Sequence, residues 1–288
     1  MNNLITGTTK LTALLGSPVS HSISPLMHNE AFKLLNLDYV YLCFDVAEKG
    51  LKSTIDGFRT MNVKGFNLTM PDKIAIIEYL DELTPEAKMI GAVNTVVNVD
   101  GKLIGHNTDG YGYMESVKDA GHNIIGGKMT VLGAGGASSA ICVQAAKDGV
   151  KEIRIFSRKS ASFNLAKSLC DEINKNTGCH SDVFDIEDEK ALKESIVKST
   201  IFINTSPVGM SPNEDSCLIN DPEILNSNLI VSDIIYNPKE TKLLKMAKAR
   251  GCKTFNGAYM LLYQGSKAFE IWTGSKMPVN NIKEKFFM

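Results

Sequence analysis

Four short segments of the chain concentrate hydroxyl, amide and charged side chains, the groups that could bind and transform a small polar ligand. Serine, threonine and asparagine offer donors and acceptors without charge, which suits a ligand that carries several hydroxyl groups. Lys73 and Asp109 are the natural titrating pair among them. The four segments are Gly16–Pro25, Asn67–Lys73, Gly91–Val96 and Gly105–Gly110.

A glycine-rich run, Gly133–Ala140, directly follows the apolar stretch Met129–Leu132. A buried strand that stops at closely spaced glycines and continues in small residues is typical of a strand that turns sharply into a helix. Gly133 permits the tight turn, and Gly135 and Gly136 let the backbone approach a pyrophosphate at the helix N-terminus. The pattern predicts a dinucleotide ligand.

The residues after the next strand indicate which dinucleotide is bound. That strand ends at Phe156 and is followed by Ser157, Arg158, Lys159 and Ser160, with no carboxylate to grip the ribose 2′-hydroxyl of NAD. An arginine can bind a 2′-phosphate bidentately and a lysine adds a point charge. The sequence therefore favours NADP, while NAD stays open because arginine can also stack on adenine.

Composition excludes several classes of protein. The 288 residues carry a formal net charge of -1, with 43% hydrophobic and 22% charged residues, which gives no reason to expect a nucleic acid or an anionic membrane as partner. The N-terminus lacks the features of a signal peptide. The six cysteines and five histidines show neither disulfide-framework nor metal-ligand spacing. We expect a cytoplasmic protein without a bound metal.

Two patterns of elements follow along the chain. The first half mixes strands at 11–15, 39–46, 65–68, 92–99 and 102–106 with helices that begin at a Ser24 cap, near Gly50 and at Thr84–Pro85. From a helix near 109–120 onwards, strands and helices alternate regularly, as in a parallel sheet. The predicted strands of this half are 130–132, 152–156, 201–204, 229–233 and 253–256, and a helix over 259–272 follows.

The fold class expected is α/β, with an N-terminal substrate-binding domain and a Rossmann-like, doubly wound NAD(P)-binding domain separated by a cleft. We expect the first domain to comprise residues 1–111 with 259–288, and the second residues 112–258.

Eight short motifs in register give the chain a specific resemblance to the shikimate dehydrogenase family, including its quinate/shikimate branch. They span the whole chain in the order of the family. The motifs are His-Ser-x-Ser-Pro-x-Met-His-Asn (21–29), Asn-x-Thr-x-Pro-x-Lys (67–73), Gly-Ala-x-Asn-Thr-Val (91–96), Asn-Thr-Asp-Gly (107–110), Gly-Ala-Gly-Gly-Ala (133–137), Val-Gly-Met (208–210), Tyr-Asn-Pro (236–238) and Gln-Gly (264–265).

The resemblance implies the roles of individual residues. Lys73 and Asp109 would be the catalytic pair. The ligands of a polyol carboxylate would be Ser22, Ser24, Asn67, Thr69, Lys73, Asn94, Asp109 and Gln264, with Tyr236 and Tyr39 as further members. The cofactor would be lined by Gly133, Ala134, Gly135, Gly136, Ala137, Ser157, Arg158, Lys159, Thr205, Ser206 and Gly257.

The activity implied is the reversible, NADPH-dependent reduction of 3-dehydroshikimate to shikimate by a monomer or homodimer. Many NADP-specific relatives carry Asn-Arg-Thr where this chain has Ser157-Arg158-Lys159, and the dual-cofactor branch often has an Asp at the position of Ser160.

Three alternatives stay open: a quinate-preferring enzyme that also uses NAD, a ligand-binding paralogue without turnover, and a Rossmann enzyme for another small substrate. Loss of Lys73 or Asp109 would indicate the paralogue, and both are present.

Overall fold

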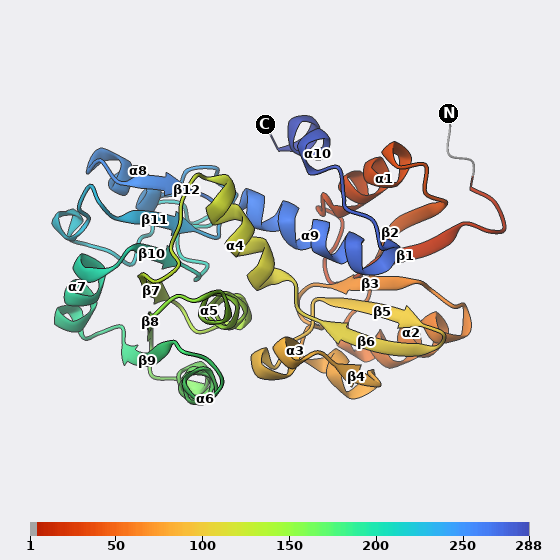
Figure 1. Ribbon diagram of the computed structural model, residues 1–288, viewed down its shortest axis with the longest axis horizontal. Helices are drawn as coiled ribbons and strands as arrows, with labels where there is room; N and C mark the ends of the chain where they lie inside the picture. The colour runs from red at the N-terminus through yellow and green to blue at the C-terminus, as the bar shows by residue number, and fades with distance from the viewer. Residues whose placement is uncertain (1–4, 288) are drawn as a thin grey trace. The chain divides into compact units, whose positions relative to one another are not determined.

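The computed structural model describes residues 5–287, and the chain divides into two compact units. One unit comprises the residues up to Gly112 together with those from Leu262 onwards, and the other is Tyr113–Leu261. Each unit is built on its own six-stranded sheet (Figure 1).

The first unit holds a mixed sheet in the order β2-β1-β3-β5-β6-β4, in which only β5 runs antiparallel to its neighbours. Its strands are β1 (Lys10–Gly16), β2 (Tyr39–Asp45), β3 (Gly65–Leu68), β4 (Glu82–Leu83), β5 (Thr95–Val99) and β6 (Lys102–His106). Its helices are α1 (Ser24–Leu34), α2 (Glu48–Thr60), the 3-10 helix η1 (Ala75–Tyr79), α3 (Pro85–Ile90), most of α9 (Ala258–Thr273) and α10 (Val279–Phe286).

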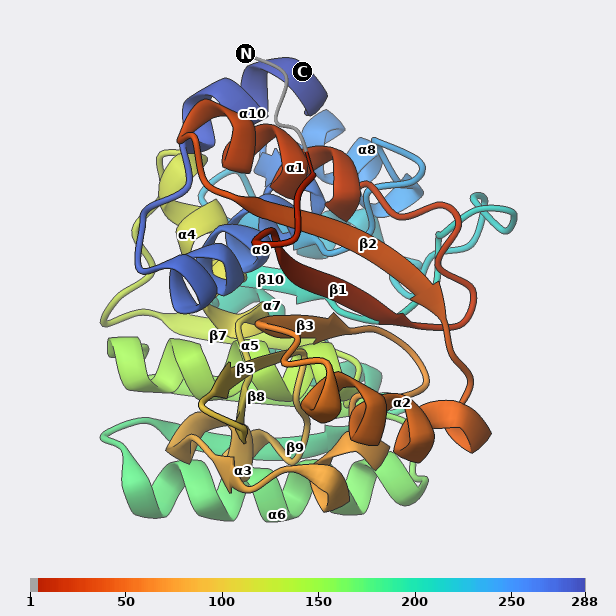
Figure 2. The same cartoon turned by 90° about the vertical axis from the view of Figure 1, so that its right-hand side faces the viewer.

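Helices cover both faces of this sheet, α1 and α2 lying on opposite sides of β1 and β2 (Figure 2). On one face Leu51, Ile55 and Phe58 of α2 pack in a core cluster with alternate residues of β1 and β3. On the other face Trp272 of α9 donates from Nε1 to the Val96 carbonyl at 2.9 Å. Gly65 allows this contact, because a Cβ there would lie 2.3 Å from the indole.

The second unit holds an all-parallel sheet in the order β12-β11-β10-β7-β8-β9. This is the doubly wound order, with its switch point between β7 and β10. The strands are β7 (Lys128–Leu132), β8 (Glu152–Ser157), β9 (His180–Asp185), β10 (Ile201–Asn204), β11 (Ile230–Asp233) and β12 (Lys253–Phe255). The helices are α4 (Asp109–Asp119, which begins in the first unit), α5 (Gly136–Asp148), α6 (Ala161–Asn176), α7 (Glu189–Lys198), the 3-10 helix η2 (Pro222–Ile224) and α8 (Lys242–Ala249).

The α/β fold class is confirmed, and most predicted elements lie within a few residues of those observed. The cap of α1 was predicted wrongly. Ile23 is the cap, Ser24 is already helical, and the Ser22 hydroxyl accepts the Ser24 N–H at 3.2 Å. The strand predicted over 92–99 begins only at Thr95. Strand β9 was not predicted, because its sequence, His-Ser-Asp-Val-Phe-Asp, is largely polar.

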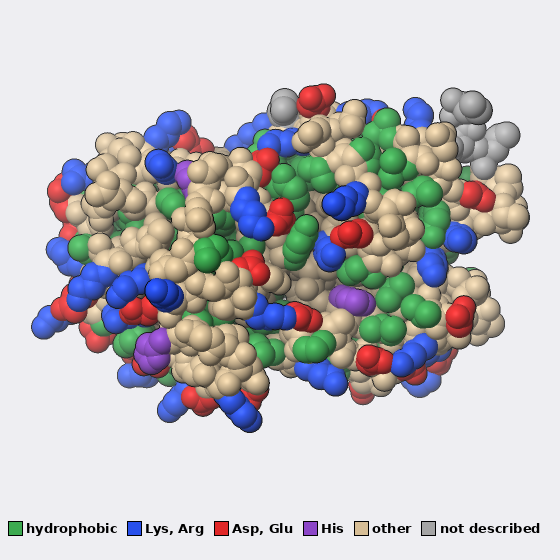
Figure 3. All heavy atoms as spheres, viewed as in Figure 1, with side chains coloured by type: hydrophobic (Ala, Val, Ile, Leu, Met, Phe, Trp, Pro, Cys, Tyr) green, Lys and Arg blue, Asp and Glu red, His purple; other side chains and the backbone are tan. Residues whose placement is uncertain are grey.

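The molecular surface mixes charges of both signs. Basic and acidic side chains are interspersed on the face drawn in Figure 3, in line with the net charge of -1. No helix in the described part of the chain combines the length and apolar character that crossing a bilayer requires.

The contact of Gly65 with Trp272 generates a stability prediction. Gly65→Ala places a methyl group 2.3 Å from the indole and 2.7 Å from the Val96 carbonyl oxygen. We expect the free energy of unfolding, measured by denaturant titration, to fall by about 2 kcal/mol or more. Gly7→Ala is the control, since nothing lies within 4 Å of its added carbon. An equal loss in the two variants would contradict the packing account.

Candidate functional site

The ion pair between Lys73 and Asp109 joins two of the four polar segments. The Lys73 Nζ is 2.7 Å from the Asp109 Oδ2, and the two side chains are 30% and 11% exposed. Lys73 lies in the turn between β3 and η1, and Asp109 is the first residue of α4. A carboxylate at a helix start is favoured by the helix dipole and by nearby unpaired N–H groups.

Asn94 holds the other oxygen of this carboxylate. Its Nδ2 donates to the Asp109 Oδ1 at 2.8 Å and, over 3.4 Å, to the Gln264 Oε1. Its Oδ1 accepts the backbone N–H of Thr108 at 2.8 Å. A backbone N–H can only donate and an ionised carboxylate can only accept, so the orientation of the Asn94 amide is determined. Asp109 is therefore fixed from two sides.

Asn67 extends the same network deeper into the unit. Its Nδ2 donates to the Asn94 carbonyl at 3.1 Å and to the Thr95 hydroxyl at 3.0 Å. The Thr95 hydroxyl in turn donates to the Asn94 Oδ1 at 3.0 Å. Asn94 and Thr95 are almost fully buried and Asn67 is 6% exposed, so most of their polar groups must be satisfied within the protein, as these bonds do.

Except for Tyr236, the remaining residues of the predicted substrate set lie in the first unit, on loops, at the start of α1 or β2, or, for Gln264, in α9. Ser22 and Ser24 are at the start of α1, and the half-buried Thr69 follows β3 and donates its N–H to the Leu15 carbonyl. Gly16 packs so closely on Thr69 that a Cβ would lie 2.3 Å from its methyl group. Tyr236 belongs to the second unit and is 48% exposed.

Three residues that the sequence did not identify as site residues belong to the network: Thr95, described above, and also Tyr41 and Thr108. The Tyr41 hydroxyl donates to the Asn67 Oδ1 at 2.8 Å, and Thr108 joins Asn94 through both its N–H and its hydroxyl. Tyr39, which was predicted instead, donates to the Trp272 carbonyl at 3.3 Å. Both tyrosines lie on one face of β2, so alternation in the strand could not distinguish them.

The turn after β7 has the form expected for a pyrophosphate site. Gly133 adopts a φ of +106°, and a Cβ there would lie 2.8 Å from the Thr205 hydroxyl, which itself donates to the Leu132 carbonyl at 2.7 Å. Gly135 and Gly136, by contrast, are exposed, and an added Cβ on either would meet nothing within 4 Å. No side chain caps the N-terminus of α5. Its first N–H groups and the open space before them fit a phosphate-bearing ligand.

The two cations after β8 differ in their surroundings. The Lys159 Nζ pairs with the Asp185 Oδ2 of β9 at 3.1 Å, whereas Arg158 is exposed and makes no ion pair within residues 5–287. The prediction that this region lacks a carboxylate holds for β8 itself but was incomplete, because the unpredicted β9 brings Asp185 beside Ser157 in register. Arg158 is the cation left for a ligand.

Two other predicted cofactor residues, Ser206 and Gly257, are held by hydrogen bonds or close packing within the second unit. Ser206 donates from its N–H and hydroxyl to the Asn204 Oδ1, and the Asn204 Nδ2 donates to the buried Asp233 carboxylate. Burial raises the pKa of Asp233 above its usual value. Gly257 lies so close to Ile234 that a Cβ would be 1.8 Å from its carbonyl oxygen. That contact alone requires glycine, so its cofactor role stays a prediction.

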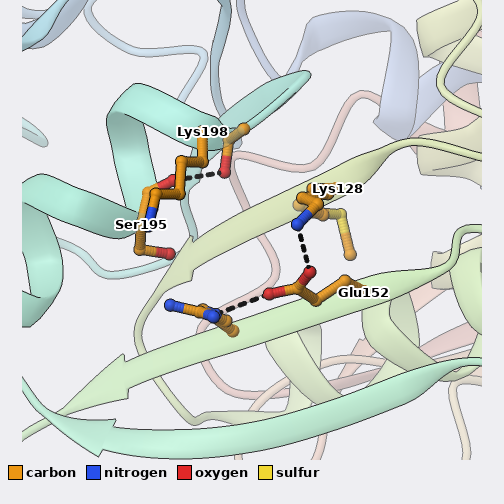
Figure 4. A pocket seen from close by; sticks show the side chains of 7 residues that line it. Lys128, Glu152, Ser195 and Lys198 are labelled. Atoms are coloured by element: carbon orange, nitrogen blue, oxygen red, sulfur yellow. Dashed lines mark hydrogen bonds and ion pairs between the residues drawn. The ribbon is translucent and has the colours of Figure 1, made fainter.

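A small cavity in the second unit lies beside the amino-terminal ends of β7 and β8 (Figure 4). The glycine-rich turn follows the other end of β7. Glu152 there bridges the Lys128 Nζ and the Arg154 Nε, each at 2.7 Å. The cavity volume of about 10 Å³ is that of a single water molecule. It is too small for a nucleotide, and two of its cations are already neutralised in part.

The fold and the site define a dinucleotide-dependent oxidoreductase, with an all-parallel nucleotide-binding sheet and, in the other unit, a lysine–carboxylate pair among neutral polar groups. Comparison with known proteins agrees. The family model for the shikimate dehydrogenase substrate-binding domain matches residues 14–96, and that for the shikimate 5′-dehydrogenase C-terminal domain matches 257–285.

Individual relatives are similar over nearly the whole chain. The shikimate dehydrogenase (NADP(+)) of Listeria monocytogenes serotype 4b is 54% identical, with 98% of this chain and 97% of that protein covered. The crystal structure of shikimate 5-dehydrogenase from Listeria monocytogenes, in complex with shikimate and NAD, has a TM-score of 0.95 and 54% identity, with 98% of each chain covered. Quinate dehydrogenase from Corynebacterium glutamicum, in complex with NAD, has a TM-score of 0.86 and 29% identity, covering 96% of this chain and 98% of that one. The chain belongs to the shikimate dehydrogenase family.

The two kinds of glycine in the turn give a prediction that separates folding from ligand binding. Gly136→Ala adds a methyl group to open space in the first turn of α5, where alanine is the better helix former. We expect the melting temperature to stay level or rise, while the dissociation constant for NADP, measured by calorimetry, increases about tenfold or more because the backbone no longer reaches the pyrophosphate.

Gly133→Ala is the matched comparison. Its φ of +106° and its contact with Thr205 should cost both stability and NADP affinity. Unchanged NADP binding in the Gly136→Ala variant would contradict the pyrophosphate site.

Proposed function

We propose that this chain catalyses the reversible reduction of 3-dehydroshikimate to shikimate with NADPH, and that Lys73 and Asp109 are the catalytic pair. Membership of the family and the names of its relatives support the reaction. The observation that carries the assignment of residues is the Lys73–Asp109 contact of 2.7 Å, with Asp109 fixed from its other side by Asn94.

Reduction of a ketone to a secondary alcohol adds a hydride to carbon and a proton to oxygen. When bound, the reduced nicotinamide supplies the hydride. The Lys73 ammonium has three N–H donors, and Asp109 is the one ion-pair partner it has within residues 5–287. A second N–H can therefore donate to the carbonyl oxygen and transfer its proton as the alkoxide forms.

Asp109 orients the ammonium and stays a carboxylate throughout this step. In the oxidative direction the neutral Lys73 amine accepts the hydroxyl proton. The assignment of the transferred proton to Lys73 rests on the remaining N–H donors of its ammonium and on its contact with Asp109.

The other site residues would bind and orient the substrate. We assign Ser22, Ser24, Asn67, Thr69, Asn94 and Gln264 to its hydroxyl and carboxylate groups, with Tyr236 as a further member of the set. For the cofactor, Gly133–Ala137 would hold the pyrophosphate, Thr205, Ser206 and Gly257 would line the pocket, and Ser157, Arg158 and Lys159 would surround the adenosine ribose. On the expected boundaries, residues 1–111 with 259–288 bind substrate and 112–258 bind NADP. A cytoplasmic location fits the six cysteines, none of which forms a disulfide, and the protein would act as a monomer or homodimer.

A second candidate function is oxidation of quinate, with use of NAD beside NADP. Two observations favour it: the structural likeness to a quinate dehydrogenase with NAD, and the pairing of Lys159 with Asp185, which leaves one free cation for a 2′-phosphate. A spectrophotometric assay at the absorbance of reduced nicotinamide, crossing shikimate and quinate with NADP and NAD, ranks the four combinations. Absence of turnover with both acids would contradict both candidates.

Lys73→Ala tests the catalytic pair. We expect kcat to fall by about 10²-fold or more, with a small change in the dissociation constant of shikimate, because a lost acid–base group affects the transition state more than the ground state. Lys102→Ala is the matched control. Lys102 also pairs with a carboxylate of the first unit, Glu82, at 2.6 Å, but this pair is more exposed than the pair of Lys73 and Asp109. Near-normal kcat in the Lys73 variant would rule out the proposed role.

Arg158→Ala tests the choice of cofactor. Loss of a charge-assisted bond to the 2′-phosphate should raise the dissociation constant for NADP about tenfold or more, and that for NAD about twofold at most. Lys159→Ala should have the smaller effect, because Asp185 already engages that ammonium. Equal losses for NADP and NAD in the Arg158 variant would show that Arg158 does not contact the phosphate.

A further inference from the structure

Tyr41 is a buried tyrosine whose hydroxyl lies inside the polar network of the first unit. It is 0% exposed, and its hydroxyl is 2.8 Å from the Asn67 Oδ1. The Ser24 hydroxyl is the second polar group at this oxygen and opposes the rise that burial causes in the Tyr41 pKa. Tyr41 thus lies between two side chains assigned to the substrate.

The direction of the bond between Tyr41 and Asn67 is fixed by chemistry. A phenol can donate or accept, and an amide could turn either end toward it. The Asn94 carbonyl, however, can only accept, so the end of Asn67 that faces it at 3.1 Å must be the Nδ2. The Oδ1 then faces Tyr41, and the tyrosine must donate. Because burial raises the pKa of Tyr41 well above its usual value, the phenol keeps its proton at neutral pH.

The same count shows what Asn67 can offer to a ligand. One Nδ2 hydrogen goes to the Asn94 carbonyl and the other to the Thr95 hydroxyl at 3.0 Å. The Oδ1 has two lone pairs, of which Tyr41 takes one. What remains on the Asn67 side chain is one acceptor position, so a ligand group bound there must be a donor.

Tyr41 is itself held firmly enough to impose this arrangement. The Asn29 side chain bonds both the N–H and the carbonyl of Tyr41, at 2.8 and 2.9 Å. Its ring stacks on the His28 imidazole at 4.4 Å between centroids, and Trp272 lies at 5.9 Å. The hydroxyl therefore has a fixed place from which to donate.

We propose that Tyr41 is a positioning residue for substrate recognition: by donating to the Asn67 Oδ1 it occupies one acceptor position and fixes the place of the other, which Asn67, oriented by the Asn94 carbonyl, offers to a hydroxyl donor on the substrate. The inference rests on the proposed function and adds to it a residue and a direction of hydrogen bonding. Tyr41 acts through Asn67 and takes no part in proton transfer.

The test compares Tyr41→Phe with Tyr79→Phe. Both variants remove one phenolic oxygen from the first unit, but Tyr79 lies in η1 and its hydroxyl makes no hydrogen bond to the network within residues 5–287. For Tyr41→Phe we expect the KM for shikimate to rise about fivefold to tenfold, the effect of one neutral hydrogen bond, with kcat and the KM for NADP within about twofold of the parent. Tyr79→Phe should leave all three constants near the parent values.

Substrate analogues that lack one or the other non-reacting ring hydroxyl identify the group that Asn67 selects. The analogue without that hydroxyl should bind the parent and the Tyr41→Phe variant equally. Tyr41 affects binding only through the contact between Asn67 and that hydroxyl, which the analogue cannot make. Turnover of shikimate by the parent protein tests the proposed function separately. With the parent active, a Tyr41→Phe variant that matches Tyr79→Phe, or that changes the KM for NADP instead, overturns the role of Tyr41.

Discussion

The fixing of the Asp109 carboxylate by Lys73 and Asn94 is the interaction on which the arrangement of the site depends. One oxygen bonds the ammonium at 2.7 Å and the other the Asn94 amide at 2.8 Å. These three residues come from the turn after β3, the loop before β5 and the start of α4. Two of these segments are also joined directly by the Val93 N–H, which donates to the Lys73 carbonyl at 2.8 Å. A carboxylate held at both oxygens sets the position of the ammonium.

Such a concentration of buried polar groups is tolerated because almost every member is paired. Asn67, Asn94 and Thr95 use their donors and acceptors on one another, and a fully satisfied network confers rigidity where a partly satisfied one would cost stability. Two neighbouring groups show the contrast. The buried His28 imidazole and Asp72 carboxylate have no hydrogen-bond partner among the described residues, and burial lowers the pKa of His28 to about 3 and raises that of Asp72. His28 thus serves as a neutral ring under Tyr41.

Local patterns in the sequence were enough to predict most elements. The Thr84 cap, which accepts the Ala87 N–H, and the hairpin turned at Asp100–Gly101 depend on residues a few positions apart. The errors had two causes, a competing hydrogen bond two residues away and a strand pairing between distant segments. Serine is a common cap residue, but the Ser22 hydroxyl accepts the Ser24 N–H. The helix therefore starts at Ser24, one residue before the predicted start. Strand β9 is polar and exists through its pairing with β8.

The sequence alone determined the α/β class, the glycine-rich turn and, through motifs in register with a family, the Lys73–Asp109 pair. The fold class and the turn follow from hydrophobic periodicity and backbone preferences. The pair follows from the order of motifs that the chain shares with the family. Only the tertiary structure decided which tyrosine of β2 reaches Asn67, and that Asp185 engages Lys159. Both outcomes depend on the register between strands and on the direction of hydrogen bonds across the sheet, and these are set by packing rather than by any residue's own preference.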